Sequence, residues 1–266
     1  MNIETVKTKL FSMDYFKFGS GKKTLVILPG LSVQSVMLYA DSVADAYRMF
    51  AENDYTVYVF DRRNELPPTY NVRDMAMDTA EAFRVLGLEN VDLFGASQGG
   101  MIAMEIASQH PEMIRKLVLG STSSAVNEES CQTVDKWISL AKAGKKAELY
   151  LSFGEAVYPR DVFEQSRGLL NELSENVTDE DLSRFVILAD GMRGTDLTDD
   201  LKRISCPALV IGSMDDTVLG ADASIKLAKC LNGQKGVVLY MYNGYGHAAY
   251  DTAPDYKERM AAFLNG

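Results

Sequence analysis

Cysteine, histidine and tryptophan are scarce in this chain of 266 residues. The three cysteines, Cys131, Cys206 and Cys230, stand far apart and form no C-x-x-C pair. This spacing suggests neither a disulfide framework nor a cysteine zinc site, and it fits a reducing compartment. With two histidines in the whole chain, a histidine-based metal site is not expected either. We therefore expect no bound metal.

Long apolar runs and an excess of basic residues are also missing. No stretch of about 18 apolar residues occurs, and the first residues lack the basic region and apolar run of a secretion signal. We expect a cytoplasmic protein that does not enter a membrane. The chain has 27 basic and 37 acidic side chains, a net charge of −10. Because phosphate binding needs clustered Lys and Arg, no nucleic-acid partner is expected.

Apolar runs of strand length recur along the chain and predict a sheet. The runs cover 3–10, 15–18, 24–29, 56–61, 91–95, 116–121, 208–213 and 237–242. The first two alternate as half-buried antiparallel strands do, whereas the later ones are continuous, which is typical of parallel strands buried on both faces. Helical periodicity at 71–87 and 98–109 falls between strands. We predict an α/β protein with about eight mostly parallel strands and helices on both faces.

The alternation of strand and helix stops between residues 122 and 200. Several helical patterns follow one another there, among them 133–143 and 179–189, and no clear strand is present. We predict that residues 122–200 form a helical cap, or lid, inserted into a core made of residues 1–121 and 201–266.

Ser97 is the candidate nucleophile. It stands in Gly95-Ala96-Ser97-Gln98-Gly99, a match to G-x-S-x-G. The pattern alone is weakly specific, but a buried strand precedes it and an amphipathic helix follows it, which is the setting that the motif requires. Glycines on either side let strand and helix approach closely around a strained turn. Ser97 is therefore expected to stand above the edge of the sheet.

The runs TLVILPG and GASQGGMIAMEIASQHPEMIRKLVLGS resemble the α/β-hydrolase family, on both sides of the predicted cap. This resemblance implies a central mostly parallel sheet, an inserted lid and a Ser–acid–His triad in that chain order. More specifically, the sequence resembles a carboxylesterase-like serine hydrolase with an inserted helical cap.

An activated serine needs a general base, and this chain offers two histidines. His110 stands at the other end of the helix that follows Ser97, roughly 20 Å away at about 1.5 Å per residue. His247 follows the last strand in a turn-rich loop and can reach the sheet edge. His247 is therefore predicted to be the base.

Asp215 and Asp216 are the candidates for the carboxylate that orients the histidine. Both follow the strand at 208–213. The resemblance to the family favours Asp215, because the acid there comes three residues after a glycine such as Gly212. Asp216 remains the adjacent rival, and Asp222 and Asp251 are weaker candidates.

Backbone N–H groups are the expected donors to the oxyanion of a tetrahedral intermediate. The N–H of Gln98, directly after the nucleophile, is one. Pro29-Gly30-Leu31 resembles the oxyanion loop of the family and implies the N–H of Leu31 as the second. Many relatives have histidine where this chain has Pro29, so the anchoring of the loop is expected to differ.

Two other features of the sequence allow more than one interpretation. Residues 19–22 (GSGK) resemble part of a phosphate-binding loop, but Phe16 occupies the place of its first glycine, so we expect a hairpin turn and no nucleotide site. Several large side chains are candidates either for a substrate pocket or for packing of the cap. These are Trp137, Tyr150, Phe153, Tyr158, Met101 and Met192.

The sequence thus predicts a serine hydrolase that cleaves a small-molecule ester through an acyl-enzyme, with no organic cofactor. Thioester, lactone, amide and carbon–carbon bond hydrolysis, acyl transfer and cofactor-free peroxidation remain open on the same triad, since neither fold nor triad fixes the acyl group. A non-catalytic ligand-binding protein is the alternative from another class. The oligomeric state is left open.

Overall fold

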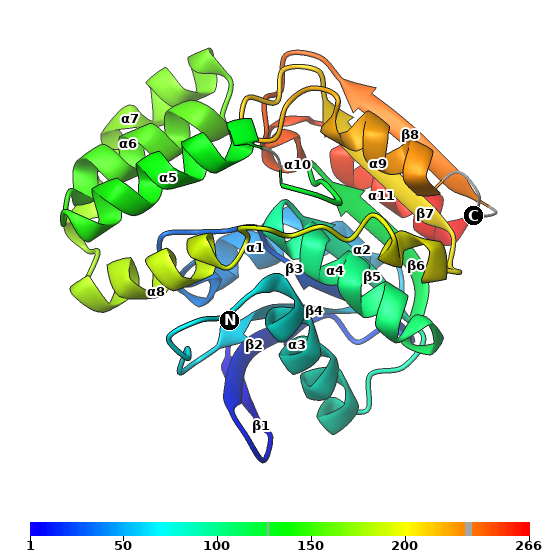
Figure 1. Cartoon of the computed structure of the whole chain (residues 1–266). Helices are drawn as coiled ribbons and strands as arrows, with labels where there is room; N and C mark the ends of the chain where they lie inside the picture. The colour runs from blue at the N-terminus through cyan, green and yellow to red at the C-terminus, as the bar shows by residue number, and fades with distance from the viewer. Residues whose placement is uncertain (127, 232–235) are drawn as a thin grey trace.

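The computed structural model describes residues 1–126, 128–231 and 236–266, and an eight-stranded sheet runs through its centre (Figure 1). The strands are β1 (Ile3–Lys7), β2 (Ser12–Phe18), β3 (Lys23–Leu28), β4 (Tyr55–Arg63), β5 (Val91–Ala96), β6 (Ile114–Gly120), β7 (Ala208–Ser213) and β8 (Val237–Tyr242). Their order is β1-β2-β4-β3-β5-β6-β7-β8. β2 pairs antiparallel with β1 and β4, and the pairs from β4 to β8 are parallel. The predicted mostly parallel sheet is confirmed.

Helices cover both faces of the sheet. They are α1 (Ala40–Ala46), α2 (Arg48–Glu52), α3 (Val72–Leu86), α4 (Gln98–Gln109), α9 (Ala223–Leu231), α10 (Ala249–Thr252) and α11 (Tyr256–Asn265), with short 3-10 turns at Val36–Tyr39, Pro111–Met113 and Asp200–Arg203. Successive strand residues point to opposite faces. Val26 and Leu28 accordingly pack in the core with α3, α4 and α9, while Leu25 and Ile27 pack with α1, α2 and α11.

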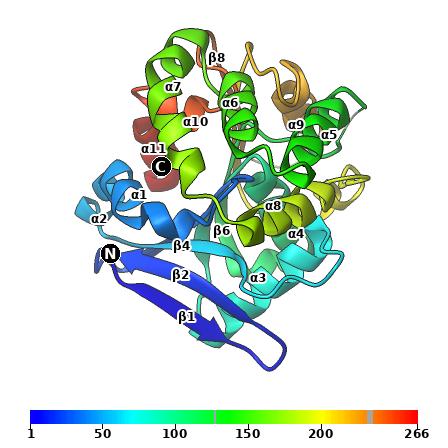
Figure 2. The ribbon, with the colours of Figure 1, turned by 90° about the vertical axis from the view of Figure 1, so that its left-hand side faces the viewer.

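The segment between β6 and β7 contains four longer helices. They are α5 (Glu128–Lys142), α6 (Lys146–Val157), α7 (Arg160–Glu175) and α8 (Asp179–Asp190). Figures 1 and 2 show them gathered on one side of the molecule, away from β1. Within the described residues this segment forms no strand, only an isolated bridge between Ala125 and Asp196. We call residues 122–200 the α5–α8 segment.

The loop at 19–22 is not a hairpin turn, so that prediction is wrong. β2 pairs with β4 rather than with β3, the strand that follows it in the chain. The glycines serve close packing instead, because a Cβ on Gly21 would lie 1.9 Å from the backbone carbon of Asp54. The loop therefore lies against the chain that enters β4.

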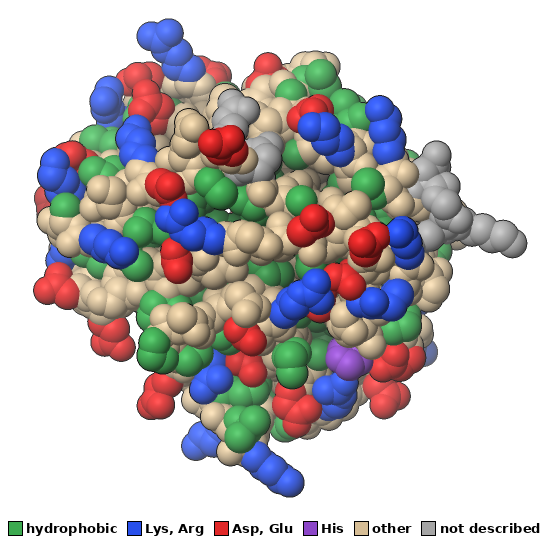
Figure 3. Space-filling view, in the orientation of Figure 1, with side chains coloured by type: hydrophobic (Ala, Val, Ile, Leu, Met, Phe, Trp, Pro, Cys, Tyr) green, Lys and Arg blue, Asp and Glu red, His purple; other side chains and the backbone are tan. Residues whose placement is uncertain are grey.

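The outer surface carries charges of both signs. On the face drawn in Figure 3, acidic and basic side chains are interspersed between apolar and neutral ones. No helix among the described residues is both long enough and apolar enough to cross a bilayer.

Candidate active site

Ser97 stands between β5 and α4 in a backbone conformation that few residues other than glycine adopt, with φ 51° and ψ −120°. Such a conformation costs about 1–3 kcal/mol and persists where the surroundings impose it. The Ser97 N–H donates to the carbonyl of Gly120 at 2.9 Å, and the Thr122 hydroxyl donates to the Ser97 carbonyl at 2.7 Å. β6 and the residues after it therefore hold the turn from both sides.

The glycines around Ser97 are required by close contacts. A Cβ on Gly95 would lie 2.4 Å from the carbonyl oxygen of Gly99, and one on Gly99 would lie 2.0 Å from the carbonyl oxygen of Leu28. Both distances are far below van der Waals contact with backbone that cannot move away. The spacing of the motif is therefore a packing requirement of this strand–turn–helix.

His247 and Asp216 form a buried pair. Nδ1 of His247 lies 2.8 Å from Oδ2 of Asp216, and the two side chains are 3% and 4% exposed. The N–H groups of Val218 and Leu219 donate to the other carboxylate oxygen at 2.9 and 3.0 Å. Hydrogen bonds to both carboxylate oxygens therefore fix the orientation of the pair.

The electrostatics of this pair define the tautomer of the histidine. Burial alone would raise the pKa of the Asp216 carboxyl, but the neighbouring His247 and the hydrogen bonds that the carboxylate accepts outweigh burial and lower this pKa below its usual value. The carboxyl group is therefore ionised near neutral pH and can only accept a hydrogen bond. Nδ1 of His247 then carries the hydrogen, and Nε2 is free to take a proton.

Asp215, the residue predicted to orient His247, lies on the outside of the turn that follows β7. Its carboxylate accepts a hydrogen bond from the N–H of Gly244, and its side chain is exposed. The N–H of Asp216 donates to the carbonyl of Ser213 at 3.3 Å, which closes a four-residue turn. The middle residues of that turn face solvent, and Asp216 returns to the interior. The predicted pairing of Asp215 with His247 is therefore wrong, and Asp216 takes that place.

Two backbone N–H groups stand next to Ser97. Gly30 passes so close that a Cβ on it would lie 3.2 Å from the Ser97 Cβ, and Leu31 follows it in the wall of the same cavity as Ser97. Gln98 is the first residue of α4, where helix N–H groups have no partner within the helix. In the described part of the chain, the N–H groups of Leu31 and Gln98 donate to no protein atom. Both are available to a bound oxygen.

Arg62, at the end of β4, was not singled out from the sequence. Its buried guanidinium donates to the carbonyl of Pro29 at 2.8 Å and to the side-chain oxygen of Gln98 at 2.9 Å. The Gln98 amide in turn donates to the carbonyl of Leu188 in α8 at 2.7 Å. Burial lowers the pKa of Arg62 to about 10, so the guanidinium remains charged at neutral pH. Arg62 thus anchors the loop in which proline replaces the histidine of many relatives.

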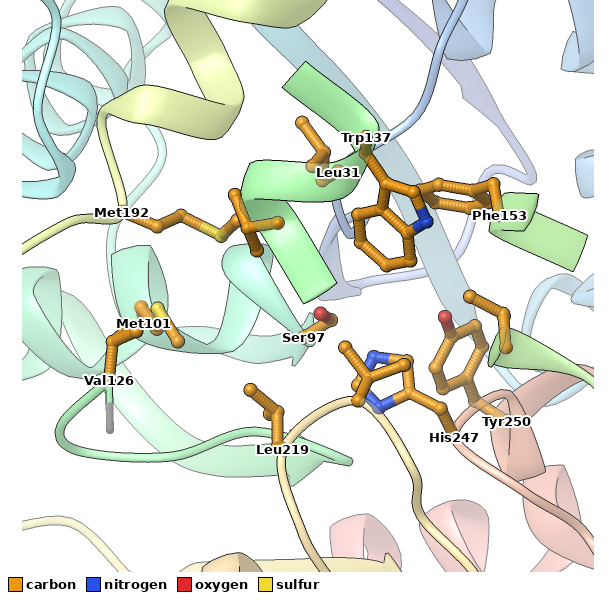
Figure 4. Close-up of a pocket in the computed structure, with 13 residues that line it drawn as sticks. Leu31, Ser97, Met101, Val126, Trp137, Phe153, Met192, Leu219, His247 and Tyr250 are labelled. Atoms are coloured by element: carbon orange, nitrogen blue, oxygen red, sulfur yellow. The ribbon is translucent and has the colours of Figure 1, made fainter. Parts of the chain in front are cut away.

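Ser97 and His247 face a small, largely apolar cavity (Figure 4). Its lining is Leu31, Ser97, Met101, Val126, Val134, Trp137, Phe153, Val157, Met192, Val218, Leu219, His247 and Tyr250. In Figure 4 the Ser97 hydroxyl and the His247 ring lie next to each other, with the indole of Trp137 above them. The cavity volume of about 30 Å³ leaves room for a small group. Four of the side chains left open by the sequence, those of Trp137, Phe153, Met101 and Met192, line it.

A larger pocket adjoins this cavity. It has a volume of about 470 Å³ and shares Leu31, Phe153, Val157 and Tyr250 with the cavity. Tyr150 and Tyr158, also left open by the sequence, belong to this second pocket. Groups too large for the cavity therefore have space directly beside it.

His110 lies at the C-terminal end of α4, as predicted. Both of its ring nitrogens are within 3.1–3.2 Å of the Arg84 guanidinium. It does not line the cavity that holds Ser97. The structure therefore brings Ser97, His247, Leu31 and Gln98 together, and leaves Asp215 and His110 outside.

Comparison with known proteins gives concordant matches. A sequence model described as the alpha/beta hydrolase family matches residues 25–259. A "Putative carbamate hydrolase RutD" of Pseudomonas savastanoi pv. phaseolicola is 28% identical over 255 residues, which cover 91% of this chain and 93% of that protein.

Two solved structures share the fold. MGS-M2, an alpha/beta hydrolase enzyme from a Medee basin deep-sea metagenome library, superposes with a TM-score of 0.86 at 20% identity, covering 99% of this chain and 98% of its own. An esterase from Exiguobacterium antarcticum gives 0.80 at 22% identity, with 96% of both chains covered. At these identities the likeness extends to the fold and no further.

Proposed function

The chain belongs to the alpha/beta hydrolase family, and from this membership and the geometry around Ser97 we propose that it is a serine hydrolase that cleaves small carboxylic esters or related acyl compounds. Ser97 is the nucleophile, His247 the base and Asp216 the orienting acid. The N–H groups of Leu31 and Gln98 hold the oxyanion.

One observation carries this proposal. A serine in a strained turn and the histidine of a buried His–Asp pair line one small apolar cavity. A histidine held by an ionised carboxylate in a water-poor site is the arrangement that activates a serine hydroxyl. Packing of the core does not explain the serine, the histidine and the aspartate, since burying a carboxylate costs free energy unless its charge is paired.

The reaction follows from these positions. Oγ of Ser97 attacks the substrate carbonyl while its proton passes to Nε2 of His247, and the carbonyl oxygen becomes an oxyanion between the two N–H groups. Collapse of the intermediate expels the alcohol, which takes the proton from Nε2. Water then attacks the acyl-enzyme while His247 accepts its proton, and the second intermediate collapses to the acid product as His247 returns this proton to Oγ of Ser97.

The two adjoining spaces suggest how a substrate is arranged. The alcohol must leave while the acyl group is still bound to Ser97, so the alcohol needs its own way out. We therefore assign the acyl group to the cavity of about 30 Å³ and the alcohol to the pocket of about 470 Å³. On this proposal residues 122–200 act as the lid, since Trp137 and Phe153 close the acyl cavity from α5 and α6.

Carbamates are the second candidate substrates. The relative from Pseudomonas savastanoi is named a putative carbamate hydrolase, and a carbamoyl group is small enough for the acyl cavity. Thioesters, lactones, carbon–carbon bonds, acyl transfer and cofactor-free peroxidation use the same first step, so they belong in the substrate panel.

The test is intact-mass measurement after exposure to a fluorophosphonate, with ester, thioester, lactone and carbamate hydrolysis measured on the same samples. We expect one label on wild type, none on Ser97→Ala, and greatly slowed labelling of His247→Ala. Asp216→Asn should be slowed, whereas the neighbouring Asp215→Asn, the matched control, should label like wild type. A wild-type protein that takes no label and hydrolyses nothing above the Ser97→Ala background would instead support a non-catalytic binding role.

A further inference from the structure

Trp137, in α5, lines the acyl cavity and carries a buried polar atom, Nε1, that the proposed reaction does not use. Its side chain is 2% exposed, and its ring packs against Phe153 with centroids 4.6 Å apart. Within the described residues the buried Nε1 has no hydrogen-bond partner. In Figure 4 this nitrogen lies on the edge of the indole that is turned toward Phe153 and Tyr250.

Tyr250 offers a second donor on the same side of the cavity. Its ring stands edge-on to that of His247, with centroids 6.4 Å apart, and its hydroxyl has no partner among the described residues. Burial, and then the charge of Asp251, raise the pKa of Tyr250 well above its usual value of 10. The hydroxyl therefore keeps its hydrogen at any pH at which the protein works.

None of the described residues supplies an acceptor to the indole N–H. An indole N–H can donate but cannot accept, and a buried donor without a partner is destabilising. Apart from Ser97, His247, Trp137 and Tyr250, the described lining side chains are hydrocarbons or methionine thioethers. A ligand that brings an oxygen acceptor would satisfy the indole.

The acceptor must also be neutral. Among the described lining residues there is no lysine or arginine, so a second carboxylate in the cavity would be buried without a countercharge. A ketone or ether oxygen meets both conditions, and the small volume places this oxygen within a few bonds of the scissile carbonyl.

We propose that the acyl cavity is built for a short acyl group that carries a neutral oxygen acceptor, and that Trp137 Nε1 donates a hydrogen bond to this oxygen. The inference rests on the proposed hydrolase function, because it specifies the substrate of that same site. Trp137 is then a specificity-determining residue, and the preferred substrates are oxo-acyl or alkoxy-acyl esters rather than plain alkanoates.

Matched pairs of esters test this substrate preference. Ethyl 4-oxopentanoate is compared with ethyl 4-methylpentanoate, and ethyl 3-oxobutanoate with ethyl 3-methylbutanoate, so that a methyl group replaces the ketone oxygen. The ratio of kcat/KM within each pair is measured for wild type and for Trp137→Phe, which removes the N–H and keeps an aromatic ring against Phe153. The difference in intrinsic reactivity between the two esters of a pair cancels, because wild type and Trp137→Phe are compared on the same pair.

We expect Trp137→Phe to lower the ratio by roughly tenfold in at least one pair, the usual worth of a hydrogen bond to a neutral group. Phe153→Leu is the control. It loosens the packing and leaves the donor, so it should change both members of a pair alike. A ratio that Trp137→Phe leaves unchanged in both pairs would overturn the proposal, even if both esters are hydrolysed rapidly.

Binding without turnover separates this inference from the hydrolase function. Trp137 is the single tryptophan of the chain, so the intrinsic fluorescence of the protein reports on this indole. With Ser97→Ala we expect the oxo ester to bind more tightly than its methyl partner and to shift the emission to longer wavelength. Equal affinities with identical emission would overturn the inference. Tighter oxo-ester binding to Ser97→Ala, found together with a wild-type protein that takes no fluorophosphonate label and hydrolyses nothing in the substrate panel, would uphold it and refute the hydrolase proposal.

Discussion

Nδ1 of His247 lies 2.8 Å from Oδ2 of Asp216, and less than a twentieth of either side chain is exposed. Water is therefore excluded from the hydrogen bond that sets the orientation of the imidazole. Because Val218 and Leu219 donate to the other carboxylate oxygen, the carboxylate cannot rotate away without losing three hydrogen bonds.

This pairing distinguishes two neighbouring aspartates. Asp216→Asn is expected to lower kcat by about a thousandfold or more, because an amide in this place stabilises the wrong tautomer of the base. Asp215→Asn should keep kcat within about threefold of wild type, because an exposed carboxylate bound to one N–H is worth little. Steady-state kinetics on one short-chain ester compare the two. Equal losses in both variants would remove Asp216 from the proposed triad.

The same carboxylate makes part of the stability depend on pH. The pKa of Asp216 is lower in the folded protein than its usual value, which is about 3.9 in an unfolded chain. Its contribution is therefore complete above about pH 5 and is lost as the pH falls through 4 toward the folded pKa. We expect the difference in free energy of unfolding between wild type and Asp216→Asn to shrink between about pH 5 and pH 2. Urea unfolding at several pH values measures it, and a gap that widens in acid would contradict this reading.

The backbone at Ser97 should show a conflict between stability and activity. Glycine adopts the observed φ of 51° without strain, whereas alanine keeps the strain of serine. Ser97→Gly is therefore expected to be about 1 kcal/mol more stable than Ser97→Ala, after allowance for the greater flexibility of glycine in the unfolded chain. Both variants should be inactive. Chemical denaturation of the pair gives the difference, and a less stable glycine variant would argue against a strained turn.

Arg62 should affect turnover more than binding. Replacement by methionine removes the donors to the Pro29 carbonyl and the Gln98 side chain, so the oxyanion N–H groups lose their support. We expect kcat to fall by roughly 10–100-fold with a small change in KM. Arg62→Lys, which can reach one of the two acceptors, should recover part of kcat. If the loss appears in KM instead, or if thermal unfolding shows a largely unfolded protein, Arg62 supports the fold and not the oxyanion site.

The two adjoining spaces predict unequal tolerance for the two halves of a substrate. Lengthening the acyl chain from four to eight carbons should lower kcat/KM by at least about tenfold, since overfilling a packed cavity costs about 1–3 kcal/mol. Lengthening the alcohol by the same amount should have a much smaller effect, because it lies in the pocket of about 470 Å³. Two ester series that vary one half at a time measure this. A reversed pattern would exchange the two assignments.

Local patterns were sufficient to predict the elements that carry Ser97. Continuous apolar runs gave β5 and β7 nearly to the residue, and helical periodicity with a small turn gave α4 directly after the nucleophile. These features depend on neighbours in the sequence, since strand burial and close strand–helix packing act over a few residues. The order of β3 and β4 in the sheet depends on distant contacts, which is why residues 19–22 were mistaken for a hairpin turn.

The acid was missed by one position for a related reason. Counting residues from Gly212 identifies the loop, but it does not tell which residue of the turn points inward. The hydrogen bond from the Asp216 N–H to the Ser213 carbonyl determines this. Arg62 had no motif at all. Its signal would have been a basic residue at the end of an otherwise apolar strand, but such residues are common at strand ends, and only the position of β4 beside β3 brings it to Pro29.

The hydrogen bond from Gln98 to the Leu188 carbonyl joins the residue after the nucleophile to α8. Any displacement of α8 takes away the acceptor of the amide, whose oxygen is one of the two partners of the Arg62 guanidinium. The position of α8 and the geometry of the oxyanion N–H groups are therefore linked equilibria, and linkage acts in both directions. A transition-state analogue that draws the N–H groups into place should for this reason also hold α8 closed, and protect its amides from hydrogen exchange.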